Sequence, residues 1–510
     1  MKNYDLTIIG NGIMGLSTAL ALCNKFPKFR IAIVGPWGNK NGASISSGAM
    51  LHCFSEVTTQ TLATAPGQAK FALCHQALKK WPIWLESINN YLPDAKKLRI
   101  YPGTYLLLNN RSSELDTDNF FAIIEALNLY SEPFEEVLPK EIGEIDPVHD
   151  ARPLRAIWVP GEGCISSHEL LSSMTTILRK MDNVDFVNDH AENIDCKNGT
   201  CKSLILKTGE VIHSEKILLA AGAFSQALID KMTDLRDSMP MVLSGVGYSI
   251  LVEQNKNKPI THAIRTPNRA GACGLHVLPR EGNSLYIGAS NDLAFAPHKD
   301  PKMGMFNFLM ECSLEQIDQK LCSSYMRGFS VGNRPATLDS FPLIGPSKIK
   351  NLFIMTGTYR DGFHQSPVMA QYMADLITNT EEDCTSPFFQ YFKPHRELIQ
   401  VKNKNDSIEE YVRHFQGSSY EHQLSLPIGI LSDDDYLDIV RKKAEKLYDT
   451  LDIDYGLPPD VLFMFALEKQ ENASIKRTTN HVRKLGYKHA EPTAEKLIPN
   501  KEILHECSIG

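Results

Sequence analysis

Three glycines near the N-terminus, Gly10, Gly12 and Gly15, have the spacing of a turn that binds a dinucleotide. In such a turn the first glycine permits a sharp change of direction, and the second lets the backbone approach a pyrophosphate. Ile13 and Met14 lie at the start of the following helix, where unpaired N–H groups can bind phosphate. We predict that these five residues bind a dinucleotide; a glycine-rich turn without a ligand is the alternative.

The segments around this turn are the ones that the motif requires. Residues 5–9 read as a buried strand, residues 16–23 as an apolar helix, and residues 30–34 as a second strand. An acidic residue usually ends the second strand and binds the adenosine ribose, but this chain has Gly35 there. We therefore expect the ribose to be bound by the backbone or by another side chain, or the second strand to be irregular.

A stretch of small residues follows the second strand. Residues 42–51 are rich in glycine, alanine and serine. This composition is typical of backbone that lies close to a ligand; a mobile surface loop is the alternative. The residues expected to contact the ligand are Ala43, Ser44, Gly48, Ala49 and Met50.

Two later segments could complete one parallel sheet with the N-terminal unit. Residues 216–222 read as a buried strand that ends in small residues, and residues 351–355 read as another strand. A helix is expected after the second of these, with Pro367 in its favoured first position. At the end of the first, the residues expected to face the ligand are Ala221 and Gly222.

The remaining segments give local predictions. Alternating apolar residues and glycine turns in residues 242–289 predict an antiparallel sheet, whereas residues 332–339 are expected to be irregular. The tripeptide Gly161-Glu-Gly163 predicts a turn between strands, and Ser167 is expected to cap a helix. A helix over residues 69–91 should be kinked at Pro82.

The bulk composition is that of a soluble globular protein. At 510 residues the chain should contain about two or three domains. A net charge of −7 argues against nucleic acid as a partner, because nucleic-acid binding needs dense positive patches. No signal peptide or membrane span is recognised, and we expect a cytoplasmic protein.

Eleven cysteines are scattered along the chain without a CxxC pair. Cys196 and Cys201 are the closest two, with a polar turn between them. Free thiols in a reducing cytosol are favoured over disulfides or a zinc site, so no metal is expected. Beyond residue 392 the sequence predicts a helix that starts with a capping box at Ser432 and runs to about residue 451, and another over residues 458–472. No catalytic motif is found in this segment.

Six segments in order give the chain a family resemblance. It resembles the FAD-dependent amine and amino-acid oxidases of the D-amino-acid oxidase, glycine oxidase and sarcosine oxidase superfamily, with glycine oxidase as the nearest pattern. Each segment is weak alone, and their order and spacing make the match strong. The segments are 9–15, 42–51, 219–225, 277–289, 333–345 and 356–362.

The resemblance implies a fold of mixed α/β and α+β class. A Rossmann-like FAD-binding domain would be discontinuous and would accompany a substrate domain built on an antiparallel sheet. Residues past about 395 fall outside the resemblance and would form a helical C-terminal extension. The implied boundaries are 1–90, 157–235 and 325–392 for the FAD-binding domain, 91–156 and 236–324 for the substrate domain, and 393–510 for the extension.

The resemblance also implies roles for particular residues. Arg334 corresponds to the arginine that pairs with the substrate carboxylate, with a structural arginine as the alternative. Arg360 corresponds to an arginine beside the flavin that assists anion binding, with a structural or flavin-side role as the alternative. His276 replaces a tyrosine that touches the carboxylate, with a hydrogen-bonded histidine of the sheet as the alternative. His52 could face the flavin ring, although a structural role is favoured for it, as for His364. The loop and helix start near the flavin would comprise Gly357, Arg360, Asp361, Gly362, Phe363, His364 and Gln365.

The implied activity is oxidation of an amino acid or a carboxylate-bearing secondary amine. Hydride transfer to FAD would give an imine that hydrolyses, and O2 would reoxidise the flavin to give H2O2. Some members of the family that the chain resembles attach the flavin covalently through a cysteine near the segment that corresponds to Arg334. Residues 329–343 contain no cysteine, so non-covalent FAD is expected. The alternatives are a dehydrogenase that passes electrons to a carrier, an oxidase of a carrier-bound or macromolecular substrate docked by the C-terminal helices, and a non-enzymatic flavin-binding protein. A homo-oligomer or a partner protein bound through residues 393–510 is a further expectation.

Overall fold

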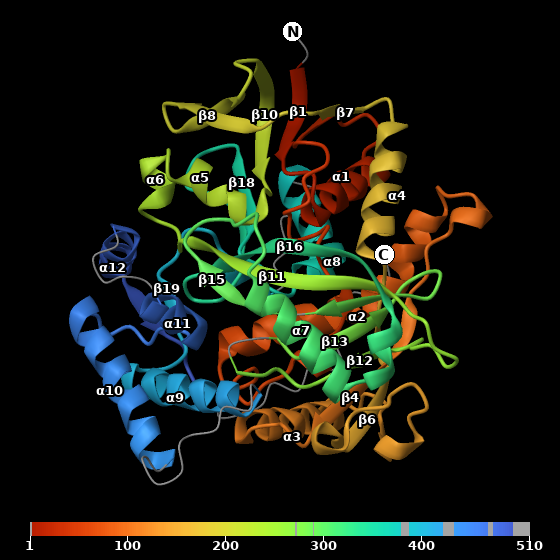
Figure 1. Cartoon of the computed structure of the whole chain (residues 1–510). Helices are drawn as coiled ribbons and strands as arrows, with labels where there is room; N and C mark the ends of the chain where they lie inside the picture. The colour runs from red at the N-terminus through yellow and green to blue at the C-terminus, as the bar shows by residue number, and fades with distance from the viewer. Residues whose placement is uncertain are drawn as a thin grey trace.

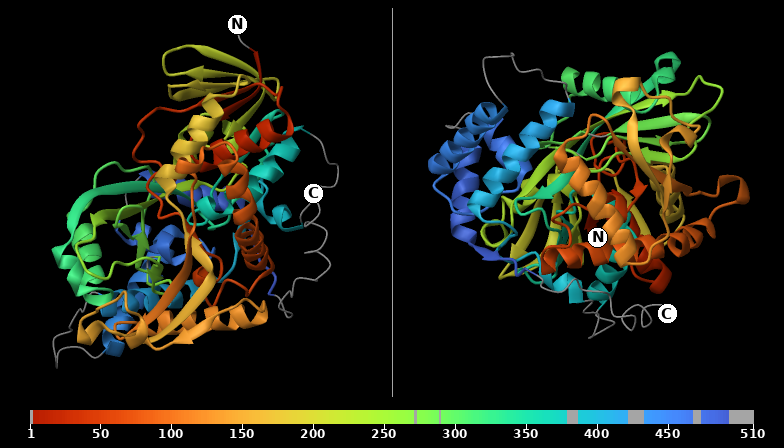
Figure 2. Two further views of the ribbon diagram at one scale, coloured as in Figure 1. Left: turned by 90° about the vertical axis from the view of Figure 1, so that its right-hand side faces the viewer. Right: turned by 90° about the horizontal axis from the view of Figure 1, so that it is seen from below.

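The computed structural model describes residues 3–270, 273–288, 290–378, 387–421, 433–467 and 473–492. In these residues the chain forms two large β-sheets with helices packed around them, and the C-terminal helices gather on one side of the molecule (Figures 1 and 2). The segments 387–421, 433–467 and 473–492 describe the C-terminal part of the chain. Among the described residues, no helix is long and apolar enough to cross a membrane.

The first sheet contains the predicted dinucleotide unit at its centre. β1 (Asn3–Ile9) pairs in parallel with both β2 (Ile31–Val34) and β10 (Val211–Leu219), so the turn after β1 lies at the carboxyl edge of three parallel strands. The order across the sheet continues with β7 (Val184–Val187) beyond β2, and with β18 (Leu352–Thr356) and β17 (Leu343–Pro346) beyond β10. A hairpin of β8 (Ala191–Lys197) and β9 (Thr200–Leu206) extends from β10.

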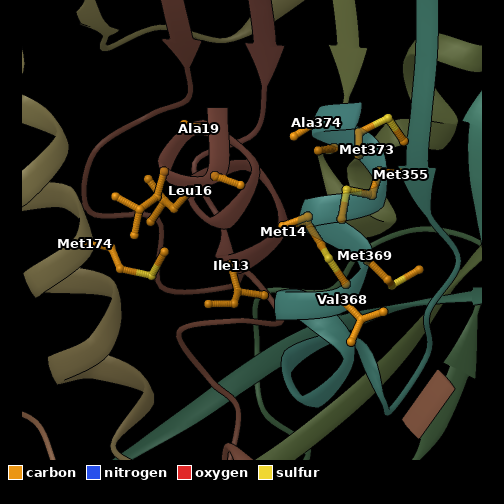
Figure 3. Close-up of a cluster of buried hydrophobic side chains, with 14 of the residues drawn as sticks. Ile13, Met14, Leu16, Ala19, Met174, Met355, Val368, Met369, Met373 and Ala374 are labelled. Carbon is orange, nitrogen blue, oxygen red and sulfur yellow. The ribbon is translucent and has the colours of Figure 1, made fainter. Parts of the chain in front are cut away.

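Four helices pack around this sheet and its turn: α1 (Ile13–Lys25), α2 (Ala65–Asn89), α4 (Ser167–Arg179) and α8 (Gly362–Thr378). Figure 3 shows Met14 of α1 beside Val368 and Met369 of α8, with Met355 of β18 close by. Each large apolar side chain buried in this way contributes roughly 1.5–3 kcal/mol. The packing of α8 on α1 fixes the start of α8 beside the dinucleotide turn. Two short helices, α5 (Ser225–Ile229) and α6 (Thr233–Arg236), follow β10.

The second sheet has ten strands and is mainly antiparallel, as predicted for residues 242–289. Its order is β15 (Asp292–Ala294), β11 (Val242–Glu253), β14 (Ser284–Gly288), β13 (His276–Pro279), β12 (Ala263–Arg265), β4 (Tyr101–Asn109), β6 (Pro153–Cys164) and β3 (Met50–Leu51). β16 (Tyr325–Thr337) pairs with β11, and β5 (Glu135–Val137) pairs with β6. Helices α3 (Glu114–Leu129) and α7 (Met303–Gln316) pack on this sheet.

The C-terminal segment is helical as expected. Its described elements are α9 (Lys404–Glu421), α10 (Asp433–Leu451), α11 (Pro459–Leu467), α12 (Ala473–Leu485), and the parallel pair β19 (Leu398–Gln400) and β20 (Tyr487–His489). Their apolar side chains share one core with residues of β11, β15 and β16. The predicted end of the helix over residues 458–472 and the capping residue Ser432 lie outside the described residues.

Several local predictions are wrong. Residues 332–337 are not irregular but belong to β16, because pairing with β11 overrides the local glycine and proline signal. Gly161-Glu-Gly163 is not a turn but part of β6, where a Cβ on Gly163 would lie 2.2 Å from the carbonyl oxygen of Tyr101. The cap of α4 is Ser166 rather than Ser167, since the Ser166 side chain accepts a hydrogen bond from the Glu169 N–H.

Two further predictions need correction. Helix α8 begins at Gly362, so Pro367 lies inside the helix rather than in its first position; the packing of α8 on α1 and α2 outweighs the hydrogen bond that the proline removes. Cys196 and Cys201 form a disulfide, whereas free thiols were expected for all cysteines. They face each other across the β8–β9 hairpin, a contact that depends on strand register. The domain boundaries stay a prediction; β3 and β16, from segments assigned to the FAD-binding domain, pair in the second sheet.

Candidate active site

A cavity of about 1830 Å³ runs from the carboxyl edge of the first sheet to the second sheet. Drug-sized ligands usually occupy cavities of about 300–1,000 Å³, so this one has room for a dinucleotide and a small molecule together. Its lining includes most of the predicted site residues: Gly10, Gly12, Ile13, Met14, Ala43, Ser44, Gly48, Ala49, Met50, His52, Ala221, Gly222, His276, Arg334, Arg360, Asp361, Gly362, Phe363 and His364. Three predicted residues lie outside the lining: Gly15, Gly357 and Gln365.

The turn after β1 forms a cradle that only a residue without a side chain can complete. Gly10 has a φ of 121°, and a Cβ there would lie 2.3 Å from the carbonyl oxygen of Ala220. The hydroxyl of Ser44 accepts a hydrogen bond from the N–H of Ile13 at 3.0 Å, which ties the small-residue loop to the start of α1. Gly10, Gly12 and Met14 line the cavity beside this contact, so the turn and the start of α1 border the space that a pyrophosphate would occupy.

The structure explains why the usual ribose-binding acid is absent. A Cβ on Gly35 would lie 2.6 Å from Cγ of Asn11, so the Asn11 side chain fills the space that an acidic side chain would need. Asn11 also donates a hydrogen bond from Nδ2 to the carbonyl oxygen of Pro36 at 3.2 Å. Strand β2 is regular up to Val34, which excludes an irregular strand as the reason for the missing acid.

Arg334 lies in β16 with its guanidinium over Gly247 of the neighbouring strand β11. A Cβ on Gly247 would lie 2.4 Å from Nη2 and 2.5 Å from Cζ of Arg334, so only glycine leaves room for this placement. Nη1 donates to the carbonyl oxygen of Ser290 at 2.9 Å and is 3.4 Å from Oδ1 of Asn291. The contacts to Ser290 and Asn291 hold one side of the guanidinium, and Arg334 also lines the cavity.

A carboxylate that sequence reasoning missed lies in the same wall. Glu56 lines the cavity and forms an ion pair with Arg265, whose side chain is fully buried. Burial alone would raise the pKa of Glu56, but Arg265 and Arg360 hold that pKa at about 2. The carboxylate is therefore ionised at neutral pH. Arg360 packs against the ring of Tyr359, with 5.2 Å from its Cζ to the ring centroid.

The three predicted histidines are neutral and enclosed. Burial lowers the pKa of His276 to about 3, that of His364 to about 4, and that of His52 well below its usual value. His52 bonds Thr104 and Arg265 through its two ring nitrogens, and His364 bonds the carbonyl of Cys74. Nδ1 of His276 bonds the carbonyl oxygen of Gly274, while its Nε2 is buried without a partner. Their ring nitrogens are thus poorly placed for acid–base catalysis.

Other residues of the site could not be recognised from local sequence. The side chains of Asn291 and Tyr359 donate hydrogen bonds to Asp460 of α11. Asp460 lies 101 residues after Tyr359 along the chain. Glu162 of β6 accepts hydrogen bonds from the N–H groups of residues 53–55, just before Glu56. No motif marks these residues, because their contacts arise from strand register and helix packing. Among the described residues, no cluster of His, Cys, Asp and Glu could hold a metal ion.

Comparisons to known proteins find relatives in sequence and in fold. The glycine oxidase of Geobacillus kaustophilus (strain HTA426) is 23% identical over 387 residues, which cover 74% of this chain and 94% of that protein. The crystal structure of glycine oxidase from Geobacillus kaustophilus has a TM-score of 0.64 at 20% identity and covers 76% of this chain and 98% of that one. L-proline dehydrogenase from P. horikoshii has a TM-score of 0.61 at 15% identity, with 77% and 97% covered.

These comparisons confirm the predicted fold class and the predicted cofactor. A family model described as FAD dependent oxidoreductase (DAO) matches residues 5–376, which include the dinucleotide turn, the small-residue loop, Arg334 and Arg360. The C-terminal helices α9 to α12 lie beyond the end of that match. The match spans well over half of the chain, and this protein therefore belongs to the FAD-dependent oxidoreductase family.

Proposed function

We propose that the protein oxidises an amino acid, or a secondary amine that carries a carboxylate, at the carbon next to nitrogen. The observation that carries this proposal is the guanidinium of Arg334, which lies over Gly247 in the cavity wall and is held by the carbonyl of Ser290. A planar guanidinium in a fixed orientation binds a carboxylate through two parallel hydrogen bonds. The names of similar proteins, glycine oxidase and L-proline dehydrogenase, agree with an amino-acid substrate.

The residues of the cradle fit FAD as a non-covalent cofactor. The backbone at Gly10 and Gly12 and the start of α1 would bind the pyrophosphate. Helix α8 begins at Gly362 in the cavity wall, and its first N–H groups would stabilise negative charge on the cofactor. When bound, FAD supplies the acceptor for the hydride that leaves the substrate carbon.

The substrate nitrogen must bind in its unprotonated form. The three predicted histidines have pKa values lowered by burial, and Glu56 is paired with Arg265, so we assign none of these four residues as a base for an ammonium group. Arg334 would fix the carboxylate end of the substrate, and the enclosed wall would exclude water from its other end. The role of the chain is therefore orientation and electrostatics.

We propose dioxygen as the final electron acceptor. Names of similar proteins include both oxidases and dehydrogenases, so the acceptor has to be measured. Stoichiometric hydrogen peroxide during turnover in air would support the oxidase, whereas turnover only with an added dye or quinone would establish a dehydrogenase.

The experiment that tests the carboxylate role is the substitution Arg334→Ala in the FAD-loaded protein. Loss of a charged hydrogen-bonding partner typically costs about 2–5 kcal/mol, so the KM for an amino-acid substrate should rise by at least about 30-fold. The FAD content should stay unchanged, because Arg334 lies on the second sheet, away from the glycine cradle. Arg334→Lys is the matched control, since it keeps the charge and loses the planar fork. An unchanged KM in Arg334→Ala would overturn the proposed role.

A further inference from the structure

The C-terminal segment brings a carboxylate into contact with Tyr359, a residue that lines the candidate active site. Asp460 is the second residue of helix α11. Its Oδ2 accepts hydrogen bonds from the hydroxyl of Tyr359 at 2.5 Å and from Nδ2 of Asn291 at 3.0 Å. Asn291 and Tyr359 also bond each other, so the three side chains form a closed triangle.

This triangle leads directly to Arg334. Oδ1 of Asn291 lies 3.4 Å from Nη1 of Arg334, and the backbone N–H of Tyr359 donates to the carbonyl of Pro335 at 2.8 Å, next to Arg334. The ring of Tyr359 also fills the space above Gly245, where a Cβ would lie 2.8 Å from Cε2 of the ring. Asp460 is thus linked to the Arg334 guanidinium through the side chain of Asn291, and its other partner, Tyr359, is bonded to the backbone of the residue after Arg334.

The backbone that carries Asp460 is firmly held. Figure 1 shows α11 beside β15 at the edge of the second sheet, and the two elements are in contact. Val461, Leu462 and Phe465 of α11 are buried in one core with Leu243 and Ala336 of the sheet. A carboxylate on so fixed a helix can hold its partners in one orientation, whereas a loop residue could not.

A purely local role would also be consistent with the position of Asp460. An acidic residue in the first turn of a helix stabilises that helix through the helix dipole. The hydrogen bonds of Asp460 given above, however, go to Tyr359 and Asn291 rather than to its own helix. Asp460 also raises the pKa of Tyr359, second in effect to burial, so this hydroxyl remains a proton donor. If Asp460 only stabilises its helix, its substitution should lower the stability alone. If it orients Tyr359 and Asn291, the substitution should also weaken substrate binding.

We propose that Asp460 is a positioning residue for substrate binding, and that the segment beyond the family match completes the substrate site. Asp460 orients Asn291 and Tyr359, which in turn hold the guanidinium of Arg334 in the orientation that binds a carboxylate. This inference rests on the proposed function of Arg334. It gives the C-terminal helices a role inside the active site of the same chain.

The test uses the full-length FAD-loaded protein and acetate, a carboxylate that cannot be oxidised at this site. Acetate binding is followed by the change that it causes in the flavin absorbance spectrum. In Asp460→Asn the Kd for acetate and the KM for the amino-acid substrate should both rise about tenfold, as expected for a weakened charged hydrogen bond. The kcat and the FAD content should stay within about twofold. Glu409→Gln, which removes a surface ion pair with Arg441 in the same segment, is the matched control and should change none of these values.

A second variant reaches the same contact from the other side. Tyr359→Phe removes the hydroxyl that Asp460 accepts, and it should weaken acetate binding by a similar factor. The double variant should be little worse than either single variant, because both remove one shared interaction. If Asp460→Asn does not fold, the Tyr359→Phe result decides.

The outcomes separate the inference from the proposed function. Unchanged acetate binding in Asp460→Asn and Tyr359→Phe, with only a lower unfolding temperature, would leave Asp460 a structural residue and overturn the inference alone. Additive losses in the double variant would also contradict it, because the two residues would then act separately. A wild-type protein that neither binds acetate nor is reduced by any amino acid would overturn both.

Discussion

At the scale of single residues, the site depends on a position that lacks a side chain. Gly247 of β11 leaves the space in which the guanidinium of Arg334 lies. Arg334 could be predicted from its neighbourhood in the sequence, because it precedes a proline in a family pattern. Gly247 could not, since its role appears only when β11 and β16 pair in the observed register. Unlike the glycines of the dinucleotide turn, Gly247 is informative only when its neighbour in space is known.

The prediction at this scale concerns Gly247→Ala. The added methyl group would lie 2.4 Å from Nη2 of Arg334, far closer than van der Waals contact permits, so the arginine must move. We expect the KM for the amino-acid substrate to rise about 10- to 100-fold, with the FAD content unchanged, because small misplacements of binding groups have effects of this size. Gly304→Ala is the control, since its Cβ would meet open space. Equal KM values for the two variants would contradict the placement of Arg334.

At the scale of secondary-structure elements, buried polar groups fix the short segments that the sheets leave irregular. Glu162 of β6 accepts hydrogen bonds from three successive N–H groups at the start of the short 3-10 helix η1 (Phe54–Glu56). This contact places Glu56 in the cavity wall. The sequence around Glu162 predicted a turn, because two glycines flank it. Gly163 instead allows close approach of the Tyr101 backbone, and Gly161 leaves room for the Glu132 carboxylate, which no local pattern distinguishes from a turn.

The prediction at this scale is that Glu162→Ala destabilises the protein by about 3 kcal/mol, because it leaves buried N–H groups without an acceptor. The FAD content should fall with it, since η1 follows directly on the small-residue loop. Thermal unfolding and flavin absorbance measure the two effects. Glu136→Ala on the adjacent strand removes an exposed ion pair with Arg155 and should cost less than about 1 kcal/mol. Similar unfolding temperatures for the two variants would refute the role of Glu162.

At the scale of the whole molecule, the C-terminal segment meets the rest of the chain at buried titratable groups as well as through apolar packing. Glu421 at the end of α9 lies buried near Arg269 and Asp116. Burial raises the pKa of Glu421 to about 8 and that of Asp116 to about 6. In the unfolded chain these groups would titrate near about 4. The folded protein therefore holds more protons than the unfolded chain between those values.

Because the folded protein holds more protons than the unfolded chain, its stability should fall as the pH rises. Because the folded-state pKa values are raised, the stabilising effect is fully present below about pH 4 and is lost progressively as the pH rises from there through the raised folded-state values. We predict that the free energy of unfolding falls from pH 5 to pH 8.5, and that Glu421→Gln makes this fall smaller. Glu409→Gln, at an exposed site, should keep the wild-type dependence. Identical pH profiles for wild type and Glu421→Gln would contradict the assignment.

Part of the whole molecule could be predicted from the sequence, and part depended on contacts between distant segments. The order of the dinucleotide turn, the small-residue loop and the Arg334 segment predicted the fold class and the cofactor, because these features are local and recur at fixed spacing. Asp460 could not be predicted to lie near Tyr359, since that contact requires the docking of α11 on the second sheet. The Cys196–Cys201 disulfide was missed for a similar reason, as it depends on the register of one hairpin.

The central claim is that the protein oxidises an amine held by its carboxylate. The most direct measurement is anaerobic mixing of the FAD-loaded protein with matched pairs of compounds that differ only in the carboxylate, such as glycine and methylamine or sarcosine and dimethylamine. We expect at least one carboxylate-bearing compound to bleach the flavin absorbance, and the matched compound without the carboxylate to leave it unchanged. Bleaching by both members of every reactive pair at equal rates, or by no amino acid or secondary amine in a broad panel, would contradict it.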